Sequence, residues 1–147
     1  MQKISSTTKA YLAGFLDGDG SIYARLKPNS TYKYGFQVAP YVAFFQSSKN
    51  KKNFEKVCSL INIGYIRERK DGIMEFIISK NEDIREFLKI VKPYSVMKKQ
   101  QIALMVEILD FKEKIKNKKE FEKLMKLINR FQELNYSKKR KLRILTP

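Results

Sequence analysis

Residues 11–20, Tyr-Leu-Ala-Gly-Phe-Leu-Asp-Gly-Asp-Gly, constrain this chain more than any other segment. They read as a short apolar helix that ends in an acidic turn with alternating glycines. At about 100° per residue, such a helix divides into two unlike faces. The bulky face, which we expect to fill the core, consists of Tyr11, Leu12, Phe15 and Leu16. The small face, with Asp17 among its members, consists of Ala10, Ala13, Gly14 and Gly18.

A small helix face allows a second backbone to approach closely. If that second backbone is the same helix from another copy of the chain, the two Asp19 carboxylates meet at one place. Paired carboxylates are hard oxygen ligands of the kind that Mg²⁺ prefers. The alternative is an ordinary buried helix with a glycine at its C-terminus, which leaves the Asp17-Gly18-Asp19-Gly20 turn unexplained.

The chain has 147 residues and a formal net charge of +16, because 31 Lys and Arg residues outnumber 15 Asp and Glu residues. This length suits one domain, which we expect to span residues 1–147, with a core at about 7–134 and a basic tail at 135–147. The charge indicates a polyanionic partner, which is DNA, RNA or an anionic membrane surface. The sequence contains no apolar run of about 18 residues, the length that spans a bilayer. Nothing in the sequence therefore spans a bilayer, and because the apolar helix faces are needed inside the protein, we expect no membrane partner.

The start of the sequence has neither a secretory apolar core nor an arginine-rich transit peptide. This pattern is typical of a protein that is made where it works. We expect a protein that is not secreted and that acts in the chloroplast or mitochondrion whose genome encodes it, or in a microbial cytoplasm.

The absence of histidine excludes several kinds of catalytic site. Ser-His and Cys-His hydrolysis, histidine-ligated zinc and a histidine general base all require this residue. The one cysteine, Cys58, sits in an apolar helical pattern and reads as core filler. A hydrolase with this composition needs another source of nucleophile, and water activated by a metal is the natural one.

The hydrophobic periodicity predicts an α+β fold, in which four short antiparallel strands have helices on one face and further helices follow. Asp71-Gly72 is a strong hairpin signal between the last two strands. Pro40 indicates a bulge or an unpaired edge position in the second strand. The expected elements are a helix ending at Gly18–Gly20, strands at 21–26 and about 34–46, a helix at 51–61, strands at 65–70 and 73–79, and helices at 81–92, from 98 and at roughly 120–134.

The stretch Leu12–Gly20 resembles the signature of the LAGLIDADG homing endonucleases, whose pattern it keeps at nearly every position. The resemblance continues through Lys27-Pro28-Asn29 and residues 64–69, 98–101 and 135–138, so that it covers essentially the whole chain. Since the signature occurs once, the chain resembles the single-motif members of the family. These are compact homodimers with an αββαββα core.

This resemblance implies a site-specific DNA endonuclease. It would bind a long pseudo-palindromic double-stranded DNA target as a homodimer and cut both strands by metal-dependent phosphodiester hydrolysis, leaving 3′ overhangs. Mg²⁺ is the implied cofactor, and Mn²⁺ can substitute. The resemblance places the metal on Asp19 and the carbonyl of Gly18, and it assigns Gln46 and Lys98 to the ordering of water and the steadying of charge. Asn50 stands where the family has a basic residue.

The outward residues of the strands are the expected base readers, since a curved sheet can enter the major groove. Arginine suits guanine, and Glu75 could accept a hydrogen bond from cytosine. The basic run after the last helix matches a loop that grips phosphates in the family, through Ser137, Lys138 and Lys141. The expected base readers are Tyr23, Arg25, Lys27, Asn29, Thr31, Tyr32, Gln37, Tyr41, Arg67, Arg69 and Glu75.

Two observations leave alternatives open. Ala39, Ala43 and Phe45 make the outward side of the second strand more apolar than expected, which favours either contacts with thymine methyl groups or a one-residue shift of the strand face. An RNA maturase and a DNA-binding protein that does not cut remain alternatives on the same scaffold. Asp19, Gln46 and Lys98 argue against the loss of cutting.

Overall fold

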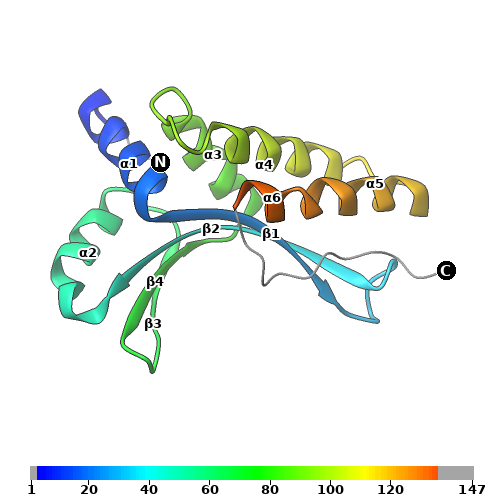
Figure 1. The fold of residues 1–147 in the computed structure, drawn as a ribbon, viewed down its shortest axis with the longest axis horizontal. Coiled ribbons are helices and arrows are strands. Elements are labelled where there is room, and N and C mark those ends of the chain that lie inside the picture. Colours follow the sequence, from blue (N-terminus) through cyan, green and yellow to red (C-terminus); the bar gives the residue numbers. More distant parts are fainter. Residues whose placement is uncertain (1–2, 136–147) are drawn as a thin grey trace. The chain divides into compact units, whose positions relative to one another are not determined.

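The computed structural model describes residues 3–135 and shows the predicted α+β fold (Figure 1). The four strands form one sheet in the order β1-β2-β4-β3. The observed elements are α1 (Ser6–Asp19), β1 (Gly20–Pro28), β2 (Phe36–Ser47), the 3₁₀ turn η1 (Ser48–Asn50), α2 (Lys51–Ser59), β3 (Tyr65–Glu68), β4 (Ile73–Ile78), α3 (Asn81–Val91), α4 (Lys99–Lys112), α5 (Lys118–Asn129) and α6 (Phe131–Leu134).

The antiparallel pairing of β2, β4 and β3 agrees with the prediction. The β3–β4 hairpin turns at Gly72, whose φ of +80° is one that glycine adopts at no steric cost. The ladder between β2 and β4 runs from Val42 to Ser47 on the β2 side, so that Pro40 precedes it and removes no bond from it. Among residues 3–135, no helix has both the length and the hydrophobicity needed to cross a membrane.

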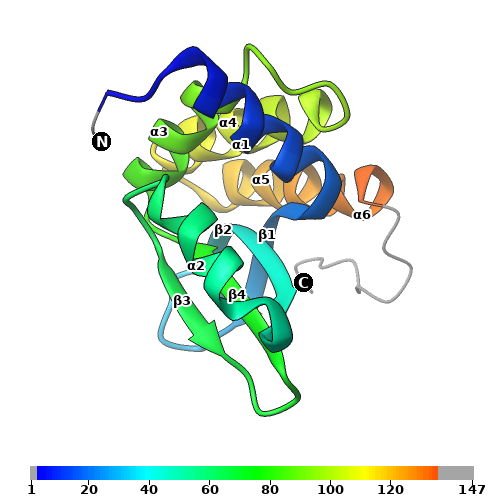
Figure 2. The same cartoon turned by 90° about the vertical axis from the view of Figure 1, so that its left-hand side faces the viewer.

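The contacts between residues divide the chain into two compact units. The first comprises residues 1–22 and 41–99, and the second comprises residues 23–40 and 100–147. In the first unit α3 lies beside α1, and the β3–β4 hairpin projects away from these two helices (Figure 2). That residues 1–147 form a single domain stays a prediction.

An aromatic cluster holds the first unit together around Phe44 of β2. Its ring stacks on Phe15 of α1 with centroids 4.8 Å apart and meets Phe87 of α3 edge-on at 5.9 Å. Phe76 of β4 lies at 6.2 Å on the same side. Each such pair contributes about 0.5–1.5 kcal/mol beyond the burial of its area. Helices α1 and α3 therefore cover one face of the sheet in this unit.

The two faces of α1 differ in part from the prediction. Leu12 and Leu16 are buried as expected, but Ala13, expected on the small outer face, is completely buried as well. Tyr11, expected in the core, is mainly exposed. The reason is that α1 packs against α3 as well as against the sheet, so that the buried side of the helix includes Ala13. The outer face that remains contains Ala10, Gly14 and Gly18.

In the second unit, aromatic side chains again join strand and helix. Tyr34 stacks on Phe121 of α5 with centroids 4.9 Å apart. Tyr23, which we expected to face outward from β1, has only 8% of its surface exposed, because Phe131 of α6 covers its ring at 5.7 Å. The side-chain amide of Gln101 donates to the carbonyl of Leu134 at 3.1 Å and ties α4 to the end of α6.

Candidate metal centre and nucleic-acid interface

The ends of α1 are defined by short-range hydrogen bonds. Ser5 is the N-cap, and its hydroxyl accepts from the backbone N–H of Thr8 at 3.2 Å. At the other end the backbone N–H of Gly20 donates to the carbonyl of Leu16. A Cβ at position 20 would lie 2.9 Å from that carbonyl oxygen, so only glycine fits this close approach. The turn leaves Asp19 exposed at the last position of the helix.

The structure brings Asp19 and Gln46 together. The Nε2 of Gln46, near the end of β2, donates a long hydrogen bond of 3.5 Å to the Oδ2 of Asp19. These are two of the residues assigned to the site by resemblance. Asn50 lies four positions further on, just before α2, where its Oδ1 accepts from Asn53 at 2.8 Å. Its side chain is therefore hydrogen-bonded to the first turn of α2 without capping the helix backbone.

Asp17 fixes the segment that leads to Lys98. Its Oδ1 accepts from the hydroxyl of Ser95 at 2.5 Å, and its Oδ2 accepts from the backbone N–H groups of Val96 at 2.7 Å and Met97 at 3.1 Å. Burial alone would raise the pKa of Asp17, but these hydrogen bonds, with one from the backbone of Lys98, outweigh it and lower that pKa. Asp17, expected at a dimer contact, thus uses its carboxylate within its own chain.

Sequence reasoning passed over Val96 and Met97. Their side chains are 71% and 75% exposed, although both residues are apolar. Both residues follow Pro93 and interrupt the helical spacing of apolar residues. This interruption is the feature of the sequence that could have identified them. Because Asp17 holds their backbone, they form a fixed apolar projection at the end of α1.

A network of charges organises the β3–β4 hairpin. Both oxygens of Glu75 are engaged, Oε2 by the Nε of Arg67 at 3.4 Å and Oε1 by the Nη1 of Arg69 at 3.2 Å. Arg69 also pairs with Asp71 at 2.7 Å. The Glu75 side chain is only 11% exposed beneath these guanidinium groups. Glu75, which we expected to read a base, pairs with two arginines in the structure and orients them. Direct contact of Glu75 with a base stays a prediction.

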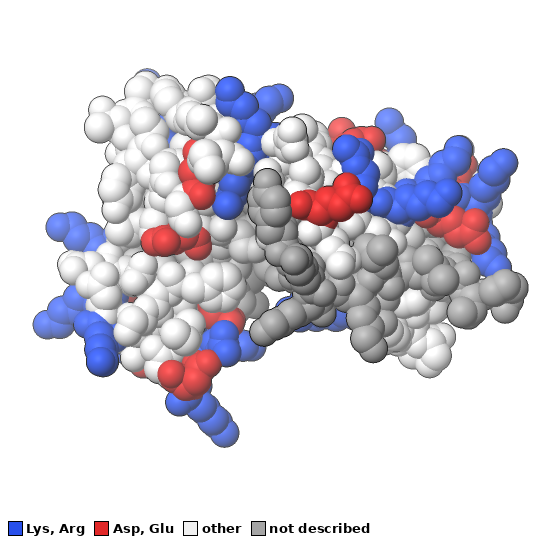
Figure 3. All heavy atoms as spheres, viewed as in Figure 1, with Lys and Arg blue, Asp and Glu red and all other residues white. Residues whose placement is uncertain are grey.

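The outward direction of Arg67 follows from the register. Arg67 is paired with Glu75, which is paired with Phe45, whereas Phe44 and Phe76 face the helices. Since side chains alternate along a strand, Arg67 lies on the face that α1 and α3 leave uncovered. Figure 3 shows basic side chains over α2 and around this hairpin, with acidic ones among them.

The other expected base readers lie in the β1–β2 region of the chain. Arg25 and Lys27 are exposed and alternate with the buried Ala24 and Leu26, as predicted. In the turn, Asn29 Oδ1 accepts from both the backbone and the hydroxyl of Thr31, at 3.0 and 2.6 Å. The three remaining readers, exposed or partly exposed, are Tyr32, Gln37 and Tyr41. Ser137, Lys138 and Lys141 lie outside the described residues.

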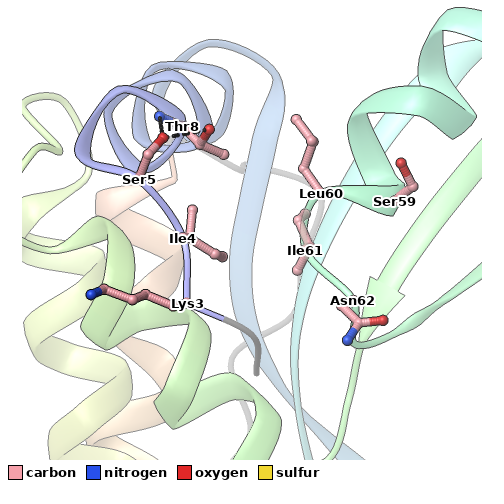
Figure 4. Close-up of a pocket in the computed structure, with 8 residues that line it drawn as sticks. All are labelled: Lys3, Ile4, Ser5, Thr8, Ser59, Leu60, Ile61 and Asn62. Carbon is pink, nitrogen blue, oxygen red and sulfur yellow. Dashed lines mark hydrogen bonds between the residues drawn. The ribbon is translucent and has the colours of Figure 1, made fainter.

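A pocket of about 280 Å³ lies at the opposite end of α1 from Asp19 (Figure 4). Its lining includes Ser5, Thr8 and Leu60 but no carboxylate. Cys58 offers no nucleophile, because burial raises the pKa of its thiol to about 12. The catalytic candidates that remain in the first unit are those around Asp19.

Three comparisons relate the chain to known proteins. A family model described as LAGLIDADG endonuclease matches residues 12–113. The DNA endonuclease I-CreI of Chlamydomonas reinhardtii is 34% identical over 100 residues, which are 68% of this chain and 61% of that protein. The chain thus spans less than two thirds of the length of this relative. The DNA endonuclease I-CvuI of Chlorella vulgaris is 30% identical over 116 residues, which are 79% and 70% of the two chains.

A solved structure extends the similarity to the fold. It contains the homing endonuclease I-CvuI in complex with the I-CreI target in the presence of 2 mM Mg, with the DNA not cleaved. The match has a TM-score of 0.86 and 27% sequence identity, and it covers 92% of this chain and 86% of the other.

Proposed function

The chain belongs to the LAGLIDADG endonuclease family, and from this premise we propose that it is a homing DNA endonuclease that acts as a homodimer. The dimer binds a long pseudo-palindromic double-stranded target, and each protomer cuts one strand. Cleavage is metal-dependent phosphodiester hydrolysis that leaves 3′ overhangs. The algal relatives favour an organelle as its place of action, with a microbial cytoplasm as the alternative.

The observation that carries this proposal is the open outer face of α1 beside Asp19. A Cβ built on Gly14 or on Gly18 would meet nothing within 4 Å. Ala10, one turn earlier on the same face, is exposed. Small residues at this spacing let two helix backbones approach closely. A second copy of α1 seated here brings a second Asp19 to the first.

The apolar projection of Val96 and Met97 supports the same dimer. The hydrogen bonds from Asp17 hold these residues at the end of α1 that also carries Asp19. Two exposed apolar side chains beside a small-residue helix face extend that face into a larger surface that can be buried. The homodimer therefore combines helix packing with burial of these side chains.

The donor set around Asp19 fits Mg²⁺, with Mn²⁺ as a substitute. Its exposed carboxylate is a hard oxygen ligand at a helix C-terminus, where the helix dipole favours a cation. The carbonyl of Gly18 is among the last carbonyls of α1, which lack partners within a helix. Within residues 3–135, no group of three or more His, Cys, Asp or Glu side chains could hold a metal. One protomer thus offers part of a site that two copies complete.

Bound Mg²⁺ supplies activation of water and neutralisation of charge on the phosphate. Asp19 would hold the ion, and the amide of Gln46, which is hydrogen-bonded to Asp19, would orient water for the reaction. Lys98 contributes a positive charge toward the scissile phosphate, from a segment fixed by Asp17. Asn50 supplies neutral hydrogen-bonding groups where relatives of this family have a cation.

DNA binding is assigned to the uncovered face of the sheet and to the β1–β2 turn. Arg67 and Arg69 are already oriented by Glu75, which lowers the entropy that guanine recognition would cost. The net charge of +16 favours phosphate contacts. Ser137, Lys138 and Lys141 are proposed phosphate contacts on the basis of the sequence alone.

The test is a cleavage assay on a plasmid that carries the joined sequences flanking this reading frame. Linear product with Mg²⁺, but not with Ca²⁺, supports the endonuclease. Binding without cutting in either metal would leave a DNA-binding protein. Rescue of splicing without any cutting would identify the RNA maturase instead.

A further inference from the structure

The uncovered face of the sheet contains an apolar patch formed by Phe45, Ile77 and Tyr65, with Ala43 between them. The register places Ala43 opposite Ile77 and Ile77 opposite Tyr65, in one row across β2, β4 and β3. Phe45 stands two residues along β2, diagonal to Ile77. All four share the face opposite Phe44 and Phe76, which lie against the helices.

Three of these side chains are open to a ligand. Phe45 is 39% exposed and Tyr65 is 52% exposed, whereas Ile77 is half-buried. Ala43 is nearly fully covered and forms the floor. Phe45 and Ile77 have no hydrogen-bonding group in their side chains. They cannot read a base edge through its donors or acceptors.

The patch is bordered by cations. Phe45, Glu75 and Arg67 form the adjacent row across the sheet, and Glu75 holds the guanidinium groups of Arg67 and Arg69 at 3.4 and 3.2 Å. An apolar centre with a fixed cationic border matches a ligand that has anionic edges and an apolar group between them. The major groove of DNA has this character, because its phosphates flank the C5-methyl groups of thymine.

We infer that the apolar patch reads thymine through its 5-methyl group, so that each half-site carries thymine against Phe45 and Ile77. This inference rests on the proposed function as a DNA endonuclease. It also distinguishes DNA from RNA, since uracil lacks the methyl group and the major groove of an RNA helix is too narrow for side chains. The two apolar side chains thus contribute sequence preference that the arginines do not.

The test replaces the methyl group alone. A duplex is first selected by binding from a random library in Ca²⁺. One thymine position at a time is then replaced by deoxyuridine, at the equivalent position of both half-sites. Burial of one methyl group is worth about 0.8 kcal/mol, so the loss of one methyl group from each of the two half-sites corresponds to about a 15-fold change in Kd. We expect this loss at one or two neighbouring positions and no change at the others.

A double-mutant cycle assigns the effect to the patch. Phe45→Ala removes the difference between thymine and deoxyuridine at those positions, while Phe45→Leu keeps part of it. Leu60→Ala is the matched control, because Leu60 is a comparably exposed apolar residue that follows α2 and lies outside the sheet. The Leu60→Ala variant should retain the full difference in Kd between the thymine and deoxyuridine duplexes.

Two results would overturn the inference while the proposed function stands. One is tight, salt-dependent binding in which no deoxyuridine substitution changes Kd. The other is a methyl effect that Phe45→Ala leaves intact. Failure of every duplex in the library to bind would count against the proposed function itself, and with it the inference.

Discussion

The amide of Gln46 hydrogen-bonds the carboxylate of Asp19 over 3.5 Å and so links the end of β2 to the end of α1. The sheet and the signature helix meet at the residue that we assign to the metal. In the proposed function, this contact would couple the DNA-binding face of the sheet to the metal site. Both residues belong to the same compact unit.

Asp19→Asn should abolish cleavage and leave specific DNA binding intact. The substitution keeps the size and the contact with Gln46 but removes the charge that holds a divalent ion. Cleavage is measured with Mg²⁺ and binding with Ca²⁺ on the same duplex. Residual cutting at the wild-type rate would remove Asp19 from the metal site.

Gly14→Leu should convert the dimer to a monomer without unfolding the protomer. The side chain enters open space in one chain, since nothing lies within 4 Å of the added Cβ. Against a second α1 it would cost about 1–3 kcal/mol, which corresponds to a dimer that is roughly fivefold to 150-fold weaker. Analytical ultracentrifugation reports the dissociation constant. Lys52→Leu on α2, at an exposed position, is the control of equal bulk and should stay dimeric.

Asp17→Ala should destabilise the protein and loosen the segment before Lys98. It leaves the donors of Ser95, Val96 and Met97 without their acceptor, at a cost of about 1–3 kcal/mol. Urea unfolding at pH 7 measures the loss. A free energy of unfolding equal to that of the wild type would show that the segment is held by other contacts.

The contribution of Asp17 to stability should also depend on pH. Because hydrogen bonds lower its pKa in the folded state below the ordinary 3.8, its stabilisation is present above that value. It is lost as the pH falls through the lower, folded-state pKa. The free energy of unfolding of the wild type should therefore fall more steeply below about pH 4 than that of Asp17→Ala. Parallel pH profiles would contradict this assignment.

Glu75→Gln should reduce discrimination between target and unrelated DNA. Without the carboxylate, Arg67 and Arg69 are no longer held in place, and each well-placed contact to guanine is worth about 1–3 kcal/mol. We expect the ratio of nonspecific to specific Kd to fall by roughly tenfold. Glu68→Gln removes the same charge from the same hairpin, where Glu68 pairs with Lys51 at 3.6 Å, and should preserve the ratio.

Local signals were sufficient for the fold. The glycine turn after Asp19, the hairpin at Gly72 and the alternation of Ala24 with Arg25 each depend on neighbours in the sequence, and the structure agrees with them. The element order and the α+β class followed from these signals. Expected ends were less accurate, since β3 stops at Glu68 rather than at residue 70.

Contacts between distant segments caused the differences. The alternation of apolar and polar residues in β1 predicts that Tyr23 faces outward, but Phe131 of α6 covers its ring. No pattern near residue 23 indicates this contact. The role of Glu75 depends on its register with Arg67, which a hairpin signal alone does not give. Ala13 is buried because α1 packs against α3 as well as against the sheet.

The two carboxylates of the signature turn have separate duties, since Asp17 is bonded inward and Asp19 is open to the outside. Loss of the Asp19 carboxylate therefore leaves the hydrogen bonds of Asp17 to Ser95, Val96 and Met97 in place. If the proposed function holds, a single nucleotide change in codon 19 would abolish cleavage and leave the fold that binds the target intact. The resulting protein would keep the fold and the proposed DNA-binding face without the ligand that Asp19 supplies to the metal.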